Sequence, residues 1–248
     1  MHINTDINIL GGLPDWNLVL YFYDKKYKKA KLPLHTFIKT TKSVKRFESA
    51  ISGTLLKFKN KKIKVLFDSM ISSEGITKDT MLFLFWNAAL NNEFFHFLNE
   101  NVFFPALYSG RIQIRHEEVV ACLHELKSQN GTLKNWSETT IRTTASKYLT
   151  LLKKFGLLEG KQNKSIVQPF LNEKMFVIFI YWLTAVSEKT NLLLSPMLQY
   201  GFMELPVFTE RVTNKKFAKY FNIYYTGDNL KIEPKIEYEK LYEIIIRN

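Results

Sequence analysis

The chain has 248 residues, of which 46% are hydrophobic and 15% aromatic, and its formal net charge is +12. So much apolar side chain excludes wholesale disorder, and the length allows one large domain or two smaller ones. The positive charge favours polyanionic partners, although charge alone does not separate nucleic acid from a membrane surface.

Cysteine usage and hydropathy limit the compartment. A single cysteine, Cys122, excludes an intrachain disulfide framework and fits a reducing cytoplasm. Residues 1–16 lack the basic and apolar regions of a signal peptide. The longest apolar run, residues 175–186, is well short of the roughly 20 residues that a bilayer span needs. We therefore expect a cytoplasmic protein without a membrane segment.

Residues 1–107 predict a basic helical region. Apolar residues recur there at three- and four-residue steps, and Thr41 or Ser43 is the expected cap of the second helix. The segment that follows Thr77 is apolar on nearly all sides, which predicts a central helix. The expected helices are residues 16–29, 44–59, 61–72, 78–90 and 91–104, the last ending near Pro105.

Most of the positive charge lies between residues 25 and 64, where fourteen lysine and arginine residues accompany one acidic residue, Glu48. A lysine-rich soluble surface is one interpretation. The other is a face that follows a phosphate backbone, with Lys45 and Arg46 among its contacts. Clustering favours the second, because a compositional bias would spread lysine evenly. Lysine in place of arginine predicts backbone contacts more than base contacts.

Residues 108–172 predict a winged-helix domain. A β-like segment at 110–114 precedes a helix at 116–130, and a second helix runs from its cap Ser137 to Phe155. Two short segments then pair around a lysine-bearing turn, and Pro169 predicts that the second of them is an edge strand. Strand, helix, helix, strand, turn and strand is the winged-helix order.

In a winged helix the second helix of the pair enters the major groove and the hairpin lies along the phosphates. The DNA-binding residues expected here are Thr139, Thr140, Arg142 and Thr143 in the groove, Lys147 near its edge, and Lys161 and Lys164 on the backbone. Arg142 is the one able to form a bidentate pair with guanine. An ordinary amphipathic surface helix is the alternative, because the helix dipole alone explains Lys153 and Lys154.

Residues 173–248 predict C-terminal helices and a second hairpin. The apolar run at 175–186 predicts a buried helix, and residues 230–236 alternate in polarity after a Gly-Asp turn. The helix, helix and hairpin order thus occurs twice. A second winged-helix-like unit is one reading, with Lys215, Lys216 and Lys219 as its DNA contacts, and a purely structural hairpin is the other.

Motifs for catalysis, cofactors and metals do not occur in the sequence. It contains no Gly-rich phosphate loop of the G-x-x-x-x-G-K-[ST] or G-x-G-x-x-G type. The segments HEEVV and HELKS begin like a zinc-protease motif but lack its second histidine. We therefore expect a protein that is not an enzyme and that binds no cofactor and no metal.

Several stretches resemble a known family: WNAAL followed by NNEFFHFLNENVFFPAL, then WSETTIRTTASKYLTLLKKFGLLEG with IVQPFL after it. The chain resembles the BrxA proteins of bacterial BREX (bacteriophage exclusion) defence systems over roughly residues 42–186. The resemblance implies a mostly helical, non-enzymatic, DNA-binding component encoded beside a methyltransferase, ATPases and a phosphatase-like protein. It also implies partial similarity to helical RNA-binding antitermination factors. The matching helix is residues 137–155, and the matching wing is residues 157–170.

The expected fold is mainly α, with a helical N-terminal region and a winged-helix C-terminal region. The expected function is that of a double-stranded DNA-binding accessory component of a BREX phage-defence system, with other BREX proteins as further partners. An RNA-binding antitermination-like module and a protein-protein adaptor within the defence complex are the alternatives.

Overall fold

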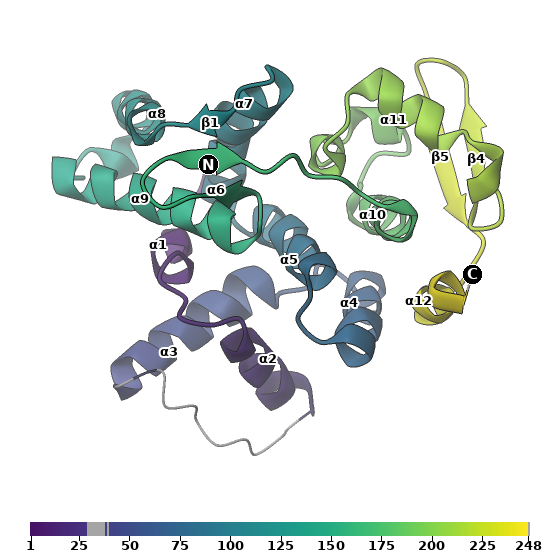
Figure 1. The fold of residues 1–248 in the computed structure, drawn as a ribbon, viewed down its shortest axis with the longest axis horizontal. Coiled ribbons are helices and arrows are strands. Elements are labelled where there is room, and N and C mark those ends of the chain that lie inside the picture. The colour runs from purple at the N-terminus through teal and green to yellow at the C-terminus, as the bar shows by residue number, and fades with distance from the viewer. Residues whose placement is uncertain (29–37, 39, 248) are drawn as a thin grey trace. The chain divides into compact units, whose positions relative to one another are not determined.

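The computed structural model describes residues 1–28, 38 and 40–247. Lys29, Lys31 and Lys39, which belong to the predicted basic segment, lie outside the described residues. The described chain is mainly helical, as expected, with two small antiparallel sheets (Figure 1).

The helices that precede the first strand agree with the sequence pattern in place but not in detail, except for the first helix, Asp6–Leu10, which was not expected. They are α1 (Asp6–Leu10), α2 (Asn17–Tyr23), α3 (Thr41–Ala50), α4 (Lys61–Glu74), α5 (Lys78–Asn91), α6 (Glu93–Leu98) and α7 (Phe104–Tyr108). Three of them continue into a π-helical turn: α2 into Asp24–Lys28, α3 into Ile51–Leu55 and α6 into Asn99–Phe103. Helices expected to be single long elements are thus α-helical in one part and π-helical in the other.

The rest of the chain alternates between helices and short strands. Its elements are β1 (Gln113–Ile114), α8 (His116–Gln129), α9 (Glu138–Lys154), β2 (Leu158–Glu159), β3 (Lys164–Ile166), α10 (Glu173–Val186), α11 (Leu205–Val212), β4 (Phe221–Tyr225), β5 (Leu230–Pro234) and α12 (Tyr238–Arg247). Short 3₁₀ turns lie at Gly131–Leu133, Leu192–Leu194, Leu198–Gly201 and Lys215–Phe217.

Side-chain caps set where the main helices begin. Thr77 caps α5 as expected, in a reciprocal pair with Thr80. The cap of α3 is Thr40, whose hydroxyl accepts from the Ser43 N–H at 3.2 Å, and not Thr41 or Ser43. Pro105 does not end a helix. It lies in the first turn of α7, where a missing N–H costs no helical hydrogen bond.

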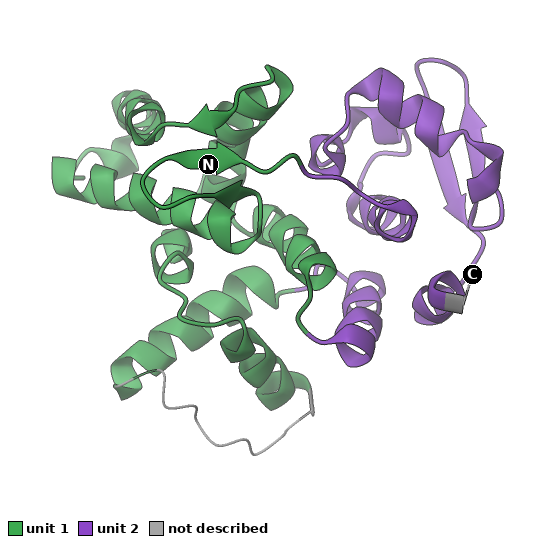
Figure 2. Ribbon diagram, in the orientation of Figure 1, with its two compact units in different colours: residues 1–57, 76–168 green, residues 58–75, 169–248 purple. Residues whose placement is uncertain are grey.

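Contacts between residues divide the chain into two compact units (Figure 2). Unit 1 comprises residues 1–57 and 76–168, and unit 2 comprises residues 58–75 and 169–248. The domains expected at 1–107, 108–172 and 173–248 stay a prediction. In the structure, however, helices from both sides of residue 108 share unit 1, and α4 belongs to unit 2.

Unit 1 is built around α5, whose residues 83–89 are buried, as its all-round apolar pattern predicts. The Phe85 ring packs edge-on against the rings of Phe95, Phe103 and Phe155. Helix α9 is fixed to this core by the buried Tyr148 hydroxyl, which lies 3.1 Å from the carbonyl oxygen of Leu98. The aromatic core therefore holds α9 in place and leaves its polar face outside.

The first sheet also belongs to unit 1 and has the strand order β1-β3-β2. Both pairings are antiparallel, with Gln113 opposite Ser165 and Leu158 opposite Ile166. We expected β3 to be an edge strand, and it is the central one. It ends at Ile166, so Pro169 lies beyond the strand and removes no hydrogen bond from the sheet.

Unit 2 forms around α10, which is buried on nearly all sides as predicted. The inward residues of α4 are Ile63, Leu66, Phe67, Met70 and Ile71, and α4 contacts both α10 and α12. The predicted second hairpin is confirmed as β4 and β5, with Leu230 and Ile232 buried. The Tyr181 hydroxyl ties α10 to this hairpin by donating to the Tyr220 carbonyl at 2.7 Å.

Candidate nucleic-acid interface

Helix α9 presents a polar face to solvent within unit 1. Ser137 caps it as predicted and accepts from the Thr140 N–H at 3.2 Å. The apolar side of the helix is buried and includes Ile141, Ala145, Tyr148 and Leu152. The exposed residues of the opposite face are Glu138, Thr139, Arg142, Thr143, Ser146 and Lys153.

The three threonines expected in the groove are not equivalent. Thr139 and Thr143 are exposed, and neither side chain forms a hydrogen bond within the described part of the chain. The hydroxyl of Thr140 is half-buried and lies 3.0 Å from Ser137 Oγ, so it takes part in the helix cap. The structure therefore leaves Thr139 and Thr143 free for an external ligand, whereas Thr140 already has a partner.

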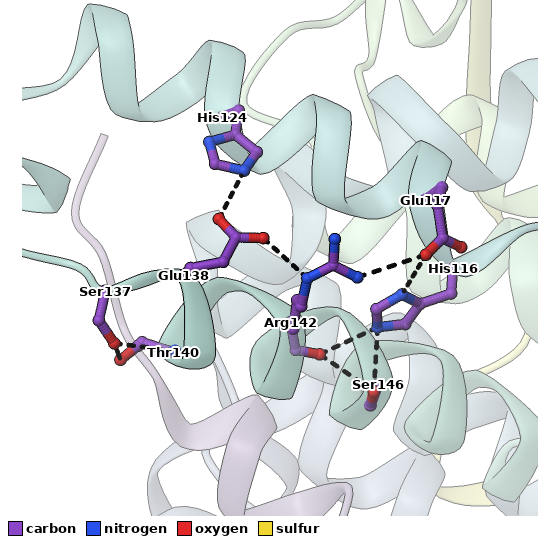
Figure 3. Close-up of polar contacts among 8 residues, drawn as sticks. All are labelled: His116, Glu117, His124, Ser137, Glu138, Thr140, Arg142 and Ser146. Atoms are coloured by element: carbon purple, nitrogen blue, oxygen red, sulfur yellow. Dashed lines mark hydrogen bonds and ion pairs between the residues drawn. The ribbon is translucent and has the colours of Figure 1, made fainter.

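Arg142 is held between two carboxylates (Figure 3). Its Nε donates to Glu138 Oε1 at 2.8 Å, one turn back on α9, and its Nη1 lies 3.4 Å from Glu117 Oε1 on α8. A hydrogen bond from His116 is the largest cause of the lowered pKa of the Glu117 carboxyl, so that carboxyl is charged at neutral pH. Two carboxylates thus offset the charge of Arg142, the residue that we expected to contact guanine.

Two histidines extend this network along α8. His124 Nε2 lies 3.0 Å from Glu138 Oε2, and His116 Nε2 lies 3.0 Å from both Ser146 Oγ and the carbonyl oxygen of Arg142 (Figure 3). A carbonyl oxygen only accepts, so its bond requires the proton to be on His116 Nε2. In that state the imidazole cannot take a proton from Ser146. The network therefore favours a structural role over that of a nucleophile-activating triad.

Lys147 lies on the other edge of the α9 face, beside α1. It is half-buried, and its ammonium borders a cavity together with Arg46 of α3. Lys154, two turns further along α9, donates to the Leu13 carbonyl at 2.6 Å, and burial lowers its pKa. The polar face of α9 is therefore flanked by carboxylates on the α8 side and by ammonium groups on the α1 side.

The lysines of the β2–β3 turn differ in whether their ammonium groups form hydrogen bonds within the protein. Lys164 Nζ donates to the Lys161 carbonyl at 2.7 Å, and Lys153 Nζ donates to the Gly160 carbonyl at 2.7 Å. Burial is the main cause of the lowered pKa of Lys164. The exposed Lys161 side chain forms no hydrogen bond or ion pair with any described residue. Both Lys161 and Lys164 were expected to contact the DNA backbone. Of the two, only Lys161 has an ammonium group without a partner among the described residues.

The sequence matches the protein-family model BrxA over residues 39–180, which is more than half of its length. The chain belongs to the BrxA family. Membership confirms the resemblance seen in the sequence and makes the chain a component of a BREX phage-defence system. No curated protein and no solved structure matches the chain.

The BrxA match runs from just before α3 into α10, so α8, α9 and the β2–β3 hairpin all lie within it. Helix α1 and the β4–β5 hairpin lie outside. The segment of the BrxA-family chain that carries the predicted DNA-binding residues is thus the one that its relatives share, with Lys215, Lys216 and Lys219 as the exceptions.

Those three lysines precede the second hairpin in unit 2. Lys216 pairs with the Glu173 carboxylate, and the Lys219 ammonium lies 5.0 Å from the centre of the Tyr220 ring. Lys215 is exposed and has no ion-pair partner among the described residues. Of these three lysines, only Lys215 has no partner among the described residues and is free to contact a phosphate.

The basic N-terminal segment is divided between the two units, because the first part of unit 1 ends at Lys57 and residues 58–75 belong to unit 2. Three of its lysines are neutralised: Lys25 by Glu48, Lys59 by Glu188 and Lys64 by Asp68. Lys45 and Arg46 are exposed on α3 and have no acidic partner in the described chain. Three of the described lysines of this segment are thus offset by carboxylates, whereas Lys45 and Arg46 are not.

Sequence reasoning missed four residues of the Arg142 network: His116, Glu117, His124 and Glu138. The four-residue spacing between Glu138 and Arg142 on one helix was a readable signal for part of it. No pattern along the chain places α8 beside α9. Within the described ranges, no group of histidine, cysteine, aspartate and glutamate side chains could hold a metal ion, and no helix is long and apolar enough to cross a membrane.

Proposed function

We propose that this BrxA-family chain is a non-enzymatic, cytoplasmic component of its BREX system that binds double-stranded DNA. Helix α9 enters the major groove, and the β2–β3 turn follows the backbone. The observation that carries the proposal is the order β1, α8, α9, β2 and β3 with the sheet order β1-β3-β2. That arrangement is the one a winged helix uses to present a polar helix and a hairpin to DNA.

The contacts available on this surface favour the phosphate backbone over the bases. Thr139, Thr143 and Lys161 are exposed and unengaged, and hydroxyl and ammonium groups are common phosphate ligands. Arg142, the best base reader of the group, is held by two carboxylates. The protein therefore binds duplexes with little sequence preference.

The direct test is fluorescence anisotropy of a labelled duplex of about 30 base pairs across a salt series. About five phosphate contacts predict a slope near −4.5 for the logarithm of affinity against the logarithm of salt concentration. Unlabelled RNA should compete poorly. Absence of binding at about 50 mM salt, where electrostatic attraction is strong, would contradict the proposal.

RNA binding is the second candidate, and one feature of unit 2 favours it. Tyr224 and Tyr225 of β4 are 53% and 42% exposed, and the Lys231 ammonium lies 5.6 Å from the centre of the Tyr224 ring. Exposed aromatic rings beside cations are platforms on which single-stranded bases stack. RNA that displaces the duplex at equal concentration, with loss of this effect in Tyr224→Ala, would favour this function.

Glu138→Gln is expected to raise duplex affinity about threefold to tenfold. The change removes a carboxylate from the α9 surface, lowers repulsion of phosphates and replaces the charged partner of Arg142 Nε with a neutral amide oxygen that holds it less strongly. Glu125→Gln is the matched control, because Glu125 is exposed on α8 and its carboxylate contacts Gln129 and not Arg142. Anisotropy at one salt concentration compares the two variants, and an equal effect of both would show that only net charge matters.

A further inference from the structure

A cavity of about 260 Å³ opens between α1, α3 and α9 in unit 1. It is lined by Asn8, Ile9, Gly12, Ser43, Arg46, Phe47 and Lys147. We propose that this cavity is a binding site for a phosphate group, with the Arg46 guanidinium and the Lys147 ammonium as its two cationic ligands. The proposal does not depend on α9 entering a DNA groove.

The two cations reach the cavity from separate helices and have no anion of their own. Neither the Arg46 guanidinium nor the Lys147 ammonium forms a hydrogen bond or ion pair within the described residues, and none of the seven lining residues is acidic. Arg46 is exposed and Lys147 half-buried, so water offsets part of each charge, but no side chain of the described residues does, and both cations attract an anion placed in the cavity. Arg142 differs from Lys147, although both lie on α9, because Arg142 is paired with two carboxylates.

The positive potential at this edge of α9 extends beyond the cavity lining. The charge of Lys147 contributes to the lowered pKa of Lys154, after the larger effect of burial. Asp15 is the acidic residue whose charge acts on Lys154, and it does not line the cavity. An anion placed between Arg46 and Lys147 would thus meet a net cationic environment.

The polar groups of the lining suit the oxygens of a phosphate. Arginine matches phosphate oxygens with two parallel N–H donors, and lysine supplies a compact point charge. Ser43, which lies one turn before Arg46 on α3, adds a hydroxyl at the same cavity. These groups supply donors and positive charge, whereas the unpaired acceptors that a metal ion needs are few.

Asn8 supplies an independent sign that the site lacks a partner. Its Nδ2 donates to Thr144 Oγ1 at 3.2 Å, but its Oδ1 is buried without a hydrogen-bond partner. A half-turn of the amide keeps the bond to Thr144, whose hydroxyl then donates, and places the Nδ2 donor where Oδ1 lay. An anion in the cavity satisfies that donor, which explains an otherwise costly buried group.

The size of the cavity and its apolar walls restrict the ligand further. A volume of about 260 Å³ lies just below the usual range for drug-sized ligands, so the cavity holds a phosphate and a small attached group. Ile9 and Phe47 provide apolar walls for that attached group. The phosphate belongs either to a nucleic-acid backbone or to a free phosphorylated compound of nucleotide size.

Calorimetric titration with adenosine 5′-monophosphate and with adenosine tests the site. We expect the wild-type protein to bind the monophosphate with a dissociation constant on the order of 0.1–1 mM and adenosine at least about tenfold more weakly. Arg46→Ala and Lys147→Met should each weaken monophosphate binding about tenfold or more. Lys78→Ala is the matched control, because Lys78 is an exposed lysine of unit 1 at the start of α5, does not line the cavity and is not among the expected DNA contacts.

Each outcome decides the matter. No binding of the monophosphate up to about 10 mM, equal binding of adenosine, or an equal loss in Lys78→Ala overturns the site, whatever the duplex does. If the selective loss is found, duplex anisotropy with Arg46→Ala and Lys78→Ala identifies the source of the phosphate. A larger loss of duplex affinity in Arg46→Ala assigns the cavity to the DNA backbone, and equal duplex affinities assign it to a free phosphorylated compound. A protein that binds no duplex but passes the monophosphate test keeps the site and loses only the proposed function.

Discussion

Thr143→Glu is expected to weaken duplex binding about a hundredfold at roughly 0.1 M salt. Thr143 is exposed on the polar face of α9, and the proposed docking brings that face against the phosphates. A new carboxylate there adds to those of Glu117 and Glu138 on the neighbouring edge. Like charges that face each other across an interface cost several kcal/mol, which corresponds to a loss of this size. Anisotropy of the labelled duplex measures it.

The control for this variant is Ala121→Glu, which adds the same charge at an exposed position of α8. Its duplex affinity should fall by less than about fivefold, through net charge alone. Thr143→Glu should keep the wild-type melting temperature, because the position is exposed and glutamate is a better helix former than threonine. Ala121→Glu should lower the melting temperature by a few degrees at most, because its glutamate faces Glu117 and Glu125 one turn away on α8. If Thr143→Glu binds duplex like the wild type, α9 is not the DNA-binding element, and the cations of α3 and the β4–β5 hairpin need to be tested next.

The elements around α9 were predictable because the signals for them are local. The Ser137 cap, the apolar spacing from Ile141 to Leu152 and the glycine after Phe155 each lie within a few residues of what they determine. Gly156 has a φ of +79°, the left-handed conformation in which glycine commonly follows a helix end. Local chemistry therefore gave the boundaries of α9 to within a residue.

The state of Arg142 was not predictable in the same way. Its bond to Glu138 follows from spacing on one helix, but its contact with Glu117 joins residues 25 positions apart. Such a pair forms only because α8 and α9 pack side by side, and charge patterns along the chain do not encode that packing. A sequence shows which side chains are able to read bases, but not which of them neighbouring elements already hold.

The packing partners of α4 were also not predictable from local sequence. Its amphipathic pattern correctly predicts a helix with one buried face. The pattern says nothing of which helices cover that face, and the structure pairs α4 with α10 and α12, more than 100 residues away in the chain. Apolar spacing thus predicts elements and burial, whereas the grouping of elements into units depends on complementary side-chain shapes.

Gly11→Ala is expected to lower the melting temperature by about 4–10 °C. An added Cβ would lie 2.4 Å from the carbonyl oxygen of Lys147, a backbone atom that cannot turn away. Relief requires α1 to move off α9 and so to expose Ile7 and Leu10, which are fully buried. Overpacking of this kind costs about 1–3 kcal/mol, which gives a shift of that size in a chain of this length. Thermal unfolding followed by circular dichroism measures it.

Gly12→Ala separates the stability of the α1–α9 contact from binding in the adjoining cavity. Its added Cβ would lie 3.3 Å from the Ile9 carbonyl oxygen and 3.5 Å from Lys147 Nζ, a flexible ammonium that is free to move. We expect a change in melting temperature of less than about 2 °C, because no backbone of α9 has to shift. Displacing the ammonium should nevertheless weaken monophosphate binding. Only Gly11→Ala places a Cβ against the Lys147 carbonyl oxygen. If Gly11→Ala and Gly12→Ala lower the melting temperature equally, this close contact is not what stabilises the packing of α1 on α9.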